Sequence, residues 1–199
     1  MQLKGSMTNN EYRALKRVSN SDLSKITGQG LDVPQSVFDF GSAVHESILE
    51  PHLNTVYENV NYDLVYRLRD SFFENPFCDF VHQHSSKEEI VLWDKFEMPL
   101  KSKLDLIFGA DRSEVFDLKT TSASSEKAFK QTIVEYNYDR QAAFYLDSIG
   151  AKTFTFIGLS KTRKKDPVFI VQATAKMIKD GRKQYEALLN YAKKNNFRF

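Results

Sequence analysis

The fold of this chain is decided by the stretch Lys103-Leu-Asp-Leu-Ile-Phe-Gly-Ala-Asp-Arg-Ser-Glu-Val-Phe-Asp-Leu-Lys119. Apolar runs at 101–108 and 114–119 flank a polar turn at 109–113, so the stretch predicts two antiparallel strands. Folding the pair symmetrically about this turn places Leu106 opposite Phe116 and Ile107 opposite Val115. Both are favourable apolar cross-strand pairs, and they support this register.

The same register places two aspartates of neighbouring strands directly opposite each other. Asp105 then faces Asp117, next to an expected Leu104–Leu118 pair, with Cβ atoms about 4.5–5.5 Å apart. Carboxylates this close repel, so one of them must protonate unless a cation lies between them. Lys119 follows Asp117 by two residues and projects from the same face. This face predicts an Mg²⁺ site, because Mg²⁺ prefers hard oxygen ligands and leaves positions for phosphate oxygens.

The sequence on both sides of this pair alternates between helical and strand patterns. Helices are predicted at 20–26, 37–49, 63–73, 77–82, 124–136, 138–149 and 175–194, and strands at 88–96, 101–108, 114–119, 153–160 and 168–173. Asn20, Ser21 and Asp22 offer N-caps for the first helix, and Met98-Pro99 is expected to be a turn. This order predicts an α/β (α+β) fold with a mixed central sheet of about five strands flanked by helices.

Composition narrows the class of protein. The chain has 199 residues and a net charge of +2, and one domain at 19–199 is expected after an N-terminal extension at 1–18. Gly5-Ser6-Met7 in that extension resembles a cloning scar. A single cysteine, Cys78, excludes a disulfide framework, a cysteine-based zinc site and an iron–sulfur cluster within one chain. The polar start and the lack of a long apolar run predict a soluble cytoplasmic protein with no membrane contact.

Helical spacing adds further candidate residues to the acidic pair. Gly41 lies one turn before His45 and leaves space beside its imidazole. Tyr138, Gln141 and Tyr145 share one helical face directly after the strand pair. The neighbouring acids Glu88 and Glu89 alternate between faces of a strand, so only one of the two can accompany the site. The residues themselves leave this choice open.

Five motifs occur in an order that resembles the PD-(D/E)xK nuclease superfamily, and in particular its RecB-like exonuclease group and the RecE-type nuclease domain of phage recombination. The motifs are Gly41-Ser-Ala-Val-His45 with Leu49-Glu50-Pro51, Glu88 with Trp93, Lys103-Leu-Asp105, Asp117-Leu-Lys119-Thr120-Thr121, and Gln141-Ala-Ala-Phe-Tyr145. The resemblance covers roughly residues 19–195. It implies a restriction-endonuclease-like core, although Leu104 stands where many members have a proline.

This resemblance also implies roles for the candidate residues. Asp105 and Asp117 would be metal ligands, with His45 near a second ion and the Leu118 carbonyl as a further ligand. Lys119 would position or activate the attacking water, and Gln141 would orient the site. Glu88 would be the acidic member from the first strand, with Glu89 in reserve. The candidates for contacts with DNA are Tyr145, Tyr138, Thr120, Lys161, Arg163 and Lys164.

The activity expected from the resemblance is an Mg²⁺-dependent deoxyribonuclease that digests double-stranded DNA from its ends. Two Mg²⁺ ions per site, with Mn²⁺ as a substitute, 5′→3′ digestion, a single-strand annealing partner and a ring-shaped homo-oligomer are implied by the family. Two alternatives stay open: a structure-specific or restriction-type endonuclease of the same superfamily, and a catalytically inactive DNA-binding module. The basic run at 161–165 fits a DNA-backbone clamp and a solvated hairpin tip equally well.

Overall fold

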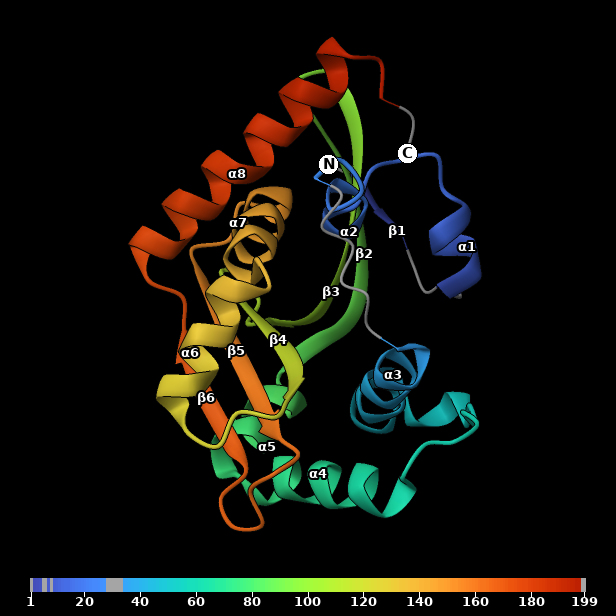
Figure 1. Cartoon of the computed structure of the whole chain (residues 1–199), viewed down its shortest axis with the longest axis vertical. Coiled ribbons are helices and arrows are strands. Elements are labelled where there is room, and N and C mark those ends of the chain that lie inside the picture. The colour runs from blue at the N-terminus through green and yellow to red at the C-terminus, as the bar shows by residue number, and fades with distance from the viewer. Residues whose placement is uncertain (1, 5–6, 8, 28–33, 198–199) are drawn as a thin grey trace.

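The fold is built on one mixed six-stranded sheet (Figure 1). The computed structural model describes residues 2–4, 7, 9–27 and 34–197. The strands lie in chain order and are β1 (Gln2–Lys4), β2 (Ser85–Lys95), β3 (Met98–Phe108), β4 (Glu114–Thr121), β5 (Thr153–Ser160) and β6 (Val168–Gln172). Only β4 and β5 run parallel; the other neighbours in this described sheet are antiparallel. The predicted α/β class and all five predicted strands are confirmed, and β1 adds a sixth.

The hairpin between β2 and β3 differs from its predicted form. Met98 and Pro99, expected to be a turn, are the first residues of β3. The turn consists of Phe96 and Glu97, which both have positive φ, at 53° and 62°. Two such residues make the tight primed turn whose twist matches the flanking strands. Pro99 has no N–H but still contributes to pairing, because its carbonyl accepts the N–H of Val18 at 2.9 Å.

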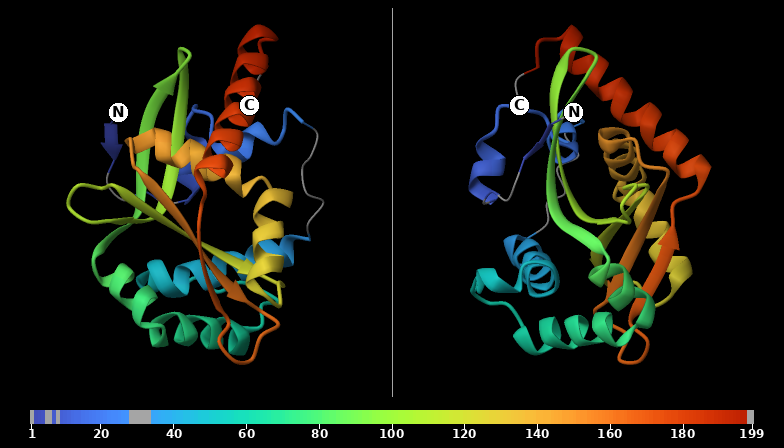
Figure 2. Two further views of the ribbon diagram at one scale, coloured as in Figure 1. Left: turned by 90° about the vertical axis from the view of Figure 1, so that its left-hand side faces the viewer. Right: turned by 180° about the vertical axis from the view of Figure 1, so that it is seen from behind.

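Helices cover both faces of the sheet (Figure 2). Neighbouring residues of β4, Val115 and Phe116, belong to two separate hydrophobic clusters, because successive side chains of a strand point to opposite faces. The Phe116 cluster includes residues of α3 (Gln35–Leu49), α4 (Tyr62–Glu74) and α5 (Pro76–Gln83). The Val115 cluster includes residues of α6 (Glu126–Glu135), α7 (Tyr138–Ile149) and α8 (Ala175–Lys194). A short 3₁₀ helix, η1 (Pro51–Leu53), follows α3.

Two short helices precede α3, and the first of them was not predicted. They are α1 (Asn9–Ala14) and α2 (Asn20–Leu23). The N-cap of α2 is Ser19, one residue before the predicted candidates, and it forms a capping box with Asp22. The proposed cloning scar at residues 5 and 6 lies outside the described residues. No helix in the described part of the chain is long and apolar enough to span a bilayer.

The crossing of α7 and α8 is unusually close. A Cβ at Gly181 would lie 2.1 Å from the Asp139 carbonyl oxygen, so only glycine allows the two helices to approach this far. Asp147 of α7 adds a polar connection, because Arg182 of α8 donates two hydrogen bonds to Asp147 Oδ1, from Nη2 at 2.6 Å and from Nε at 3.1 Å. The Asp147 carboxylate also lies 3.1 Å from Lys95 Nζ of β2. Helix α7 is therefore held firmly over the sheet, and it carries three of the predicted site residues.

Candidate active site

The candidate site lies where β3 and β4 separate. Their ladder pairs Phe108 with Glu114, Ile107 with Val115 and Leu106 with Phe116, which confirms the predicted register. One residue further, the Asp105 carboxylate accepts the Leu118 N–H at 2.8 Å in place of a backbone carbonyl.

The β3–β4 ladder ends at the Leu106–Phe116 pair, so it contains neither the predicted Leu104–Leu118 pair nor the predicted Asp105–Asp117 pair. Leu104 belongs to the hydrophobic cluster under α7, whereas Leu118 belongs to the cluster under α3. The physical reason is the Asp105 side chain, which bonds the backbone of β4 where the next step of the ladder would have formed. The strands part at this point, where the side chains of Asp105 and Asp117 are both buried.

Glu88 of β2 provides a third carboxylate beside this opening. The β2–β3 register pairs Lys87 with Leu106 and Glu89 with Leu104, so Glu88 lies next to Asp105. Its φ of 54° is uncommon for a side chain of this size and marks a local distortion of β2. Glu89 turns away and forms a two-pronged ion pair with Arg112, at 2.9 and 2.8 Å. The structure thus places Glu88 at the site and its neighbour outside it.

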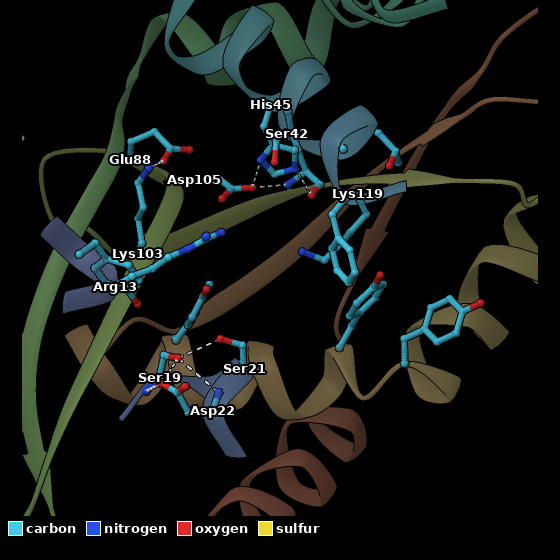
Figure 3. A pocket seen from close by; sticks show the side chains of 18 of the residues that line it. Arg13, Ser19, Ser21, Asp22, Ser42, His45, Glu88, Lys103, Asp105 and Lys119 are labelled. Atoms are coloured by element: carbon cyan, nitrogen blue, oxygen red, sulfur yellow. Dashed lines mark hydrogen bonds and ion pairs between the residues drawn. The ribbon is translucent and has the colours of Figure 1, made fainter. Parts of the chain in front are cut away.

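His45 approaches the carboxylates from α3 (Figure 3). Its Nε2 lies 2.8 Å from the Leu118 carbonyl oxygen, and its Nδ1 lies 3.5 Å from Asp105 Oδ2. Because a carbonyl only accepts, Nε2 carries the proton and the Nδ1 lone pair faces the carboxylates. Ligand atoms of His45, Glu88 and Asp105 all lie within 4.8 Å of one another. Two carboxylates and an imidazole at this spacing fit a divalent cation such as Mg²⁺ or Mn²⁺.

Asp117 lies behind this group and is connected to two other predicted residues. Its Oδ1 accepts the Gln141 side-chain amide at 2.9 Å, and its Oδ2 forms an ion pair with Lys119. The Lys119 ammonium also lies over the Tyr138 ring, 4.9 Å from the centroid. Asp117 is 1 % exposed, so these contacts occur away from bulk water, where charge interactions are strong.

The ionisable groups of the site perturb one another strongly. Burial, together with the charge of Asp117, raises the pKa of Asp105 to about 7. Burial and the charge of Asp105 raise the pKa of Glu88 to about 7. Burial acts to lower the pKa of Lys119, but the charges of Asp117 and Asp105 outweigh it and raise the pKa. Burial and the Lys119 charge lower the pKa of His45. The site therefore concentrates negative charge that a bound cation would relieve.

An open cavity of about 1640 Å³ lies in front of these residues. Of the predicted DNA-contact residues, Thr120, Tyr138, Tyr145 and Lys161 line it. Arg163 and Lys164 are not among the described residues that line it. The Arg163 guanidinium lies instead over the Phe169 ring, 5.3 Å from the ring centroid. The backbone carbonyl of Arg163 accepts a hydrogen bond from the Arg67 side chain. The 161–165 run is thus divided, with only its first residue at the cavity.

The structure also adds residues that the sequence analysis did not place in the site. Lys103 forms ion pairs with Glu88 and with Glu50, the latter at 3.3 Å. Tyr12, Arg13 and Lys16 of the N-terminal segment line the cavity. These three residues belong to the stretch 1–18 that the sequence predicts as an N-terminal extension. The sequence holds one indication of the Lys103 contact. Lys103 precedes Asp105 by two residues, so both side chains are expected on the same face of the strand.

A mixed sheet flanked by helices, with acids on adjacent strands and a lysine two residues after one of them, defines the PD-(D/E)xK class of domain. The chain belongs to the family described as PDDEXK-like domain of unknown function (DUF3799), which matches residues 54–196.

Two solved structures share the fold. One is a candidate exonuclease from Eubacterium rectale, with 14% identity, a TM-score of 0.68, and coverage of 98% of this chain and 88% of that chain. The other is the alkaline exonuclease LHK-Exo from Laribacter hongkongensis, with 12% identity, a TM-score of 0.52, and coverage of 94% of each chain. The comparison with curated proteins gives no match.

Proposed function

We propose that this chain is a divalent-metal-dependent deoxyribonuclease that hydrolyses phosphodiester bonds of duplex DNA from its ends. The observation that carries the proposal is the donor set of His45, Glu88 and Asp105 next to a buried Asp117–Lys119 ion pair. A structural domain would gain nothing from three carboxylates brought so close together, because burial and mutual repulsion destabilise them. The exonuclease names of the two structural neighbours support the choice of DNA ends as substrate.

The residues of this site suit the binding of one or two metal ions. Asp105, Glu88 and His45 would hold the metal, with Asp117 and the Leu118 carbonyl as further ligands. A bound divalent ion of this kind stabilises negative charge on the phosphoryl, attacking and leaving oxygens. Mg²⁺ is the proposed ion, and Mn²⁺ is the proposed substitute, because both accept hard oxygen ligands.

Lys119 supplies a fixed positive charge beside the reacting phosphate. Its ammonium is held between the Asp117 carboxylate and the Tyr138 ring, so it stays protonated and keeps one position. A charge prepared in this way orients the attacking water and stabilises the phosphoryl oxygens without reorganisation. Gln141 acts through Asp117, because its amide fixes the carboxylate that holds Lys119.

The finer features of the proposal concern polarity and partners. We propose digestion of the 5′-ended strand, which leaves a 3′ single strand for an annealing protein. We also propose a ring-shaped homo-oligomer, which would keep the duplex from dissociating between successive cleavages. These features follow from the resemblance of the motifs to RecE-type nucleases.

The proposed function is tested by release of nucleotides from end-labelled linear duplex DNA, with and without Mg²⁺. Asp117→Asn and Lys119→Met should each lower the rate at least about a hundredfold, since each removes a charge acting on the transition state. Lys183→Gln, which removes an exposed charge of α8, is the matched control. Wild-type rates in both site variants would refute the assignment. Cleavage of closed circular duplex would favour the endonuclease alternative.

A further inference from the structure

Lys101 of β3 makes contacts that the proposed chemistry does not explain. The residue is only 4 % exposed. Its ammonium donates to the carbonyl oxygens of Tyr12 at 2.9 Å, Arg13 at 3.2 Å and Leu15 at 3.0 Å. It also lies over the Tyr12 ring, 4.9 Å from the centroid. All three donors of the side chain are therefore directed at one short stretch of backbone.

These three carbonyls lie at or just after the C-terminal end of α1, where a helix runs short of internal donors. Two of them also accept a local backbone N–H, Tyr12 from Leu15 at 3.3 Å and Leu15 from Arg17 at 2.7 Å. A cation at this end is also favoured by the aligned peptide dipoles. A buried lysine is costly unless its hydrogen bonds are complete, and here backbone carbonyls complete them. The donors of the Lys101 ammonium are thus satisfied by this short stretch of backbone.

Further contacts hold the segment after α1 against β2 and β3. Arg17 donates to the carbonyl oxygens of Trp93 at 2.9 Å and Leu100 at 3.2 Å. Val18 exchanges backbone hydrogen bonds with both neighbours of Leu100, from its N–H to the Pro99 carbonyl and from the Lys101 N–H to its own carbonyl, each at 2.9 Å. Residues 12–18 are therefore attached to β2 and β3 between the hairpin turn and Asp105.

The attached segment presents two cations to the cavity. Arg13 and Lys16 both line the cavity, and both are exposed. Within the described part of the chain neither side chain has an ion pair or a hydrogen bond, whereas Arg17 and Lys25 nearby are each paired with an aspartate. In Figure 3 the Arg13 side chain extends into the cavity below Asp105. Free cations around an acidic centre suit a polyanion that reaches beyond that centre.

We propose that Lys101 is a positioning residue that holds residues 9–17 as one wall of the DNA-binding cavity, with Arg13 and Lys16 on this wall contacting backbone phosphates. The inference rests on the proposed function, because it takes duplex DNA as the substrate. It assigns a working role to a segment that precedes the part of the chain matched by the family.

The first experiment measures binding of a short linear duplex in EDTA, so that no hydrolysis occurs, between 50 and 200 mM salt. Arg13→Gln and Lys16→Gln should each weaken binding severalfold and reduce the slope of log affinity against log salt by about 0.9, the value for one lost phosphate contact. Lys183→Gln, which removes the same charge from an exposed position on α8, should change neither quantity. If Arg13→Gln and Lys16→Gln both keep the wild-type DNA affinity and the wild-type salt dependence, the proposal that this segment contacts DNA is wrong.

The second experiment tests Lys101 through a double-mutant cycle. Lys101→Met should weaken DNA binding at least as much as Arg13→Gln, and the two changes together should add little, because both act through the same wall. Mn²⁺ binding by calorimetry should stay at the wild-type level in Lys101→Met. Fully additive losses would overturn the positioning role. If Lys101→Met does not fold, as circular dichroism would show, the non-additivity is sought with Lys101→Arg.

These outcomes separate the inference from the proposed function. A wild-type protein that binds DNA through Arg13 but releases no nucleotides with Mg²⁺ would refute the nuclease and leave the wall intact. A wild-type protein that digests DNA, with Arg13→Gln and Lys16→Gln variants that both keep the wild-type KM, would refute the wall and leave the nuclease intact.

Discussion

Two adjacent glutamates of β2 show how one residue step changes the chemistry of a side chain. Glu88 lies beside Asp105 and has a pKa raised to about 7 by burial and by the charge of Asp105. Glu89 has a lowered pKa, chiefly because Arg112 hydrogen-bonds its carboxylate. The alternation of a strand separates the two faces, and the positive φ of Glu88 turns its backbone locally. The sequence alone offered both residues for the same role.

We predict that Glu88→Gln weakens Mn²⁺ binding at least about tenfold, since it removes a charged donor next to Asp105. Glu89→Gln should leave Mn²⁺ affinity unchanged and cost at most about 1 kcal/mol of stability, the usual value of a partly exposed ion pair. Isothermal titration calorimetry and urea unfolding measure the two effects. Both variants replace a glutamate by glutamine, at positions one residue apart, so each variant serves as the control for the other. Loss of Mn²⁺ affinity in Glu89→Gln alone would reverse the assignment.

At the scale of elements, the position of α7 depends on a polar cluster outside the site. Asp147 of α7 hydrogen-bonds Arg182 and Tyr185 of α8, and it lies 3.1 Å from Lys95 of β2. Burial acts to raise the pKa of Asp147, but these donors outweigh it and lower the pKa. The charged form is therefore favoured in the folded protein. The cluster fixes the helix whose other end supplies Gln141 and Tyr138.

Because the folded pKa of Asp147 lies below its unfolded value of about 3.9, its contribution to stability is present above that pH. The contribution is lost as the pH falls through the folded pKa. We predict that Asp147→Asn lowers the free energy of unfolding at pH 7 by about 1.5–3 kcal/mol, the value of hydrogen bonds to a charged group.

The difference between Asp147→Asn and the wild type should shrink as the pH falls below about 4, because the wild-type carboxyl then protonates. Urea unfolding at pH 7, 5, 4 and 3 measures it. Asp180→Asn, which changes a half-buried carboxylate paired with Lys176, should show a much smaller trend of the same sign, because that ion pair lowers the pKa of Asp180 but a surface pair contributes little stability. An equal loss in Asp147→Asn at pH 3 and pH 7 would mean that shape, and not charge, holds the cluster together.

At the scale of the whole molecule, the candidate metal site joins elements from distant parts of the chain. His45 comes from α3, Glu88 from β2, and Asp105 and Asp117 from β3 and β4. A ligand that binds only the folded state stabilises it by mass action. A bound cation should therefore connect α3 with strands β2, β3 and β4 and stabilise the folded protein, in addition to its role in the proposed chemistry.

We predict that Mn²⁺ at about a hundredfold above its Kd adds about 2.7 kcal/mol to the free energy of unfolding. For a chain of this length this corresponds to a rise in Tm of about 5–10 °C. Differential scanning calorimetry with Mn²⁺ and with EDTA measures the shift. Asp105→Asn should reduce it, whereas Glu89→Gln should not. An equal shift in Asp105→Asn would place the bound metal elsewhere on the molecule.

The sequence by itself determined five of the six strands of the described sheet, most helices and the central register. Alternation of apolar residues and turn chemistry act between near neighbours, and so Leu106–Phe116 and Ile107–Val115 could be paired from the turn alone. Proline is a common turn residue, and so Met98-Pro99 predicts a turn, but the carbonyl of a proline can still accept a hydrogen bond in a strand. The motif order then brought His45, Glu88, Asp105, Asp117 and Lys119 into one predicted site.

Only the tertiary structure decided which partners these side chains contact and which of them reach the cavity. In the folded chain Glu88 lies at the site and Glu89 pairs with Arg112, while Lys103 forms ion pairs with Glu88 and Glu50. Arg163 lies over the Phe169 ring and does not line the cavity, whereas Arg13 and Lys16 do. Each of these outcomes depends on contacts between residues far apart in the chain, such as the Lys101 ammonium and the carbonyls of α1. Such contacts leave no periodic trace in a sequence, because a charged side chain selects its partner by distance in space.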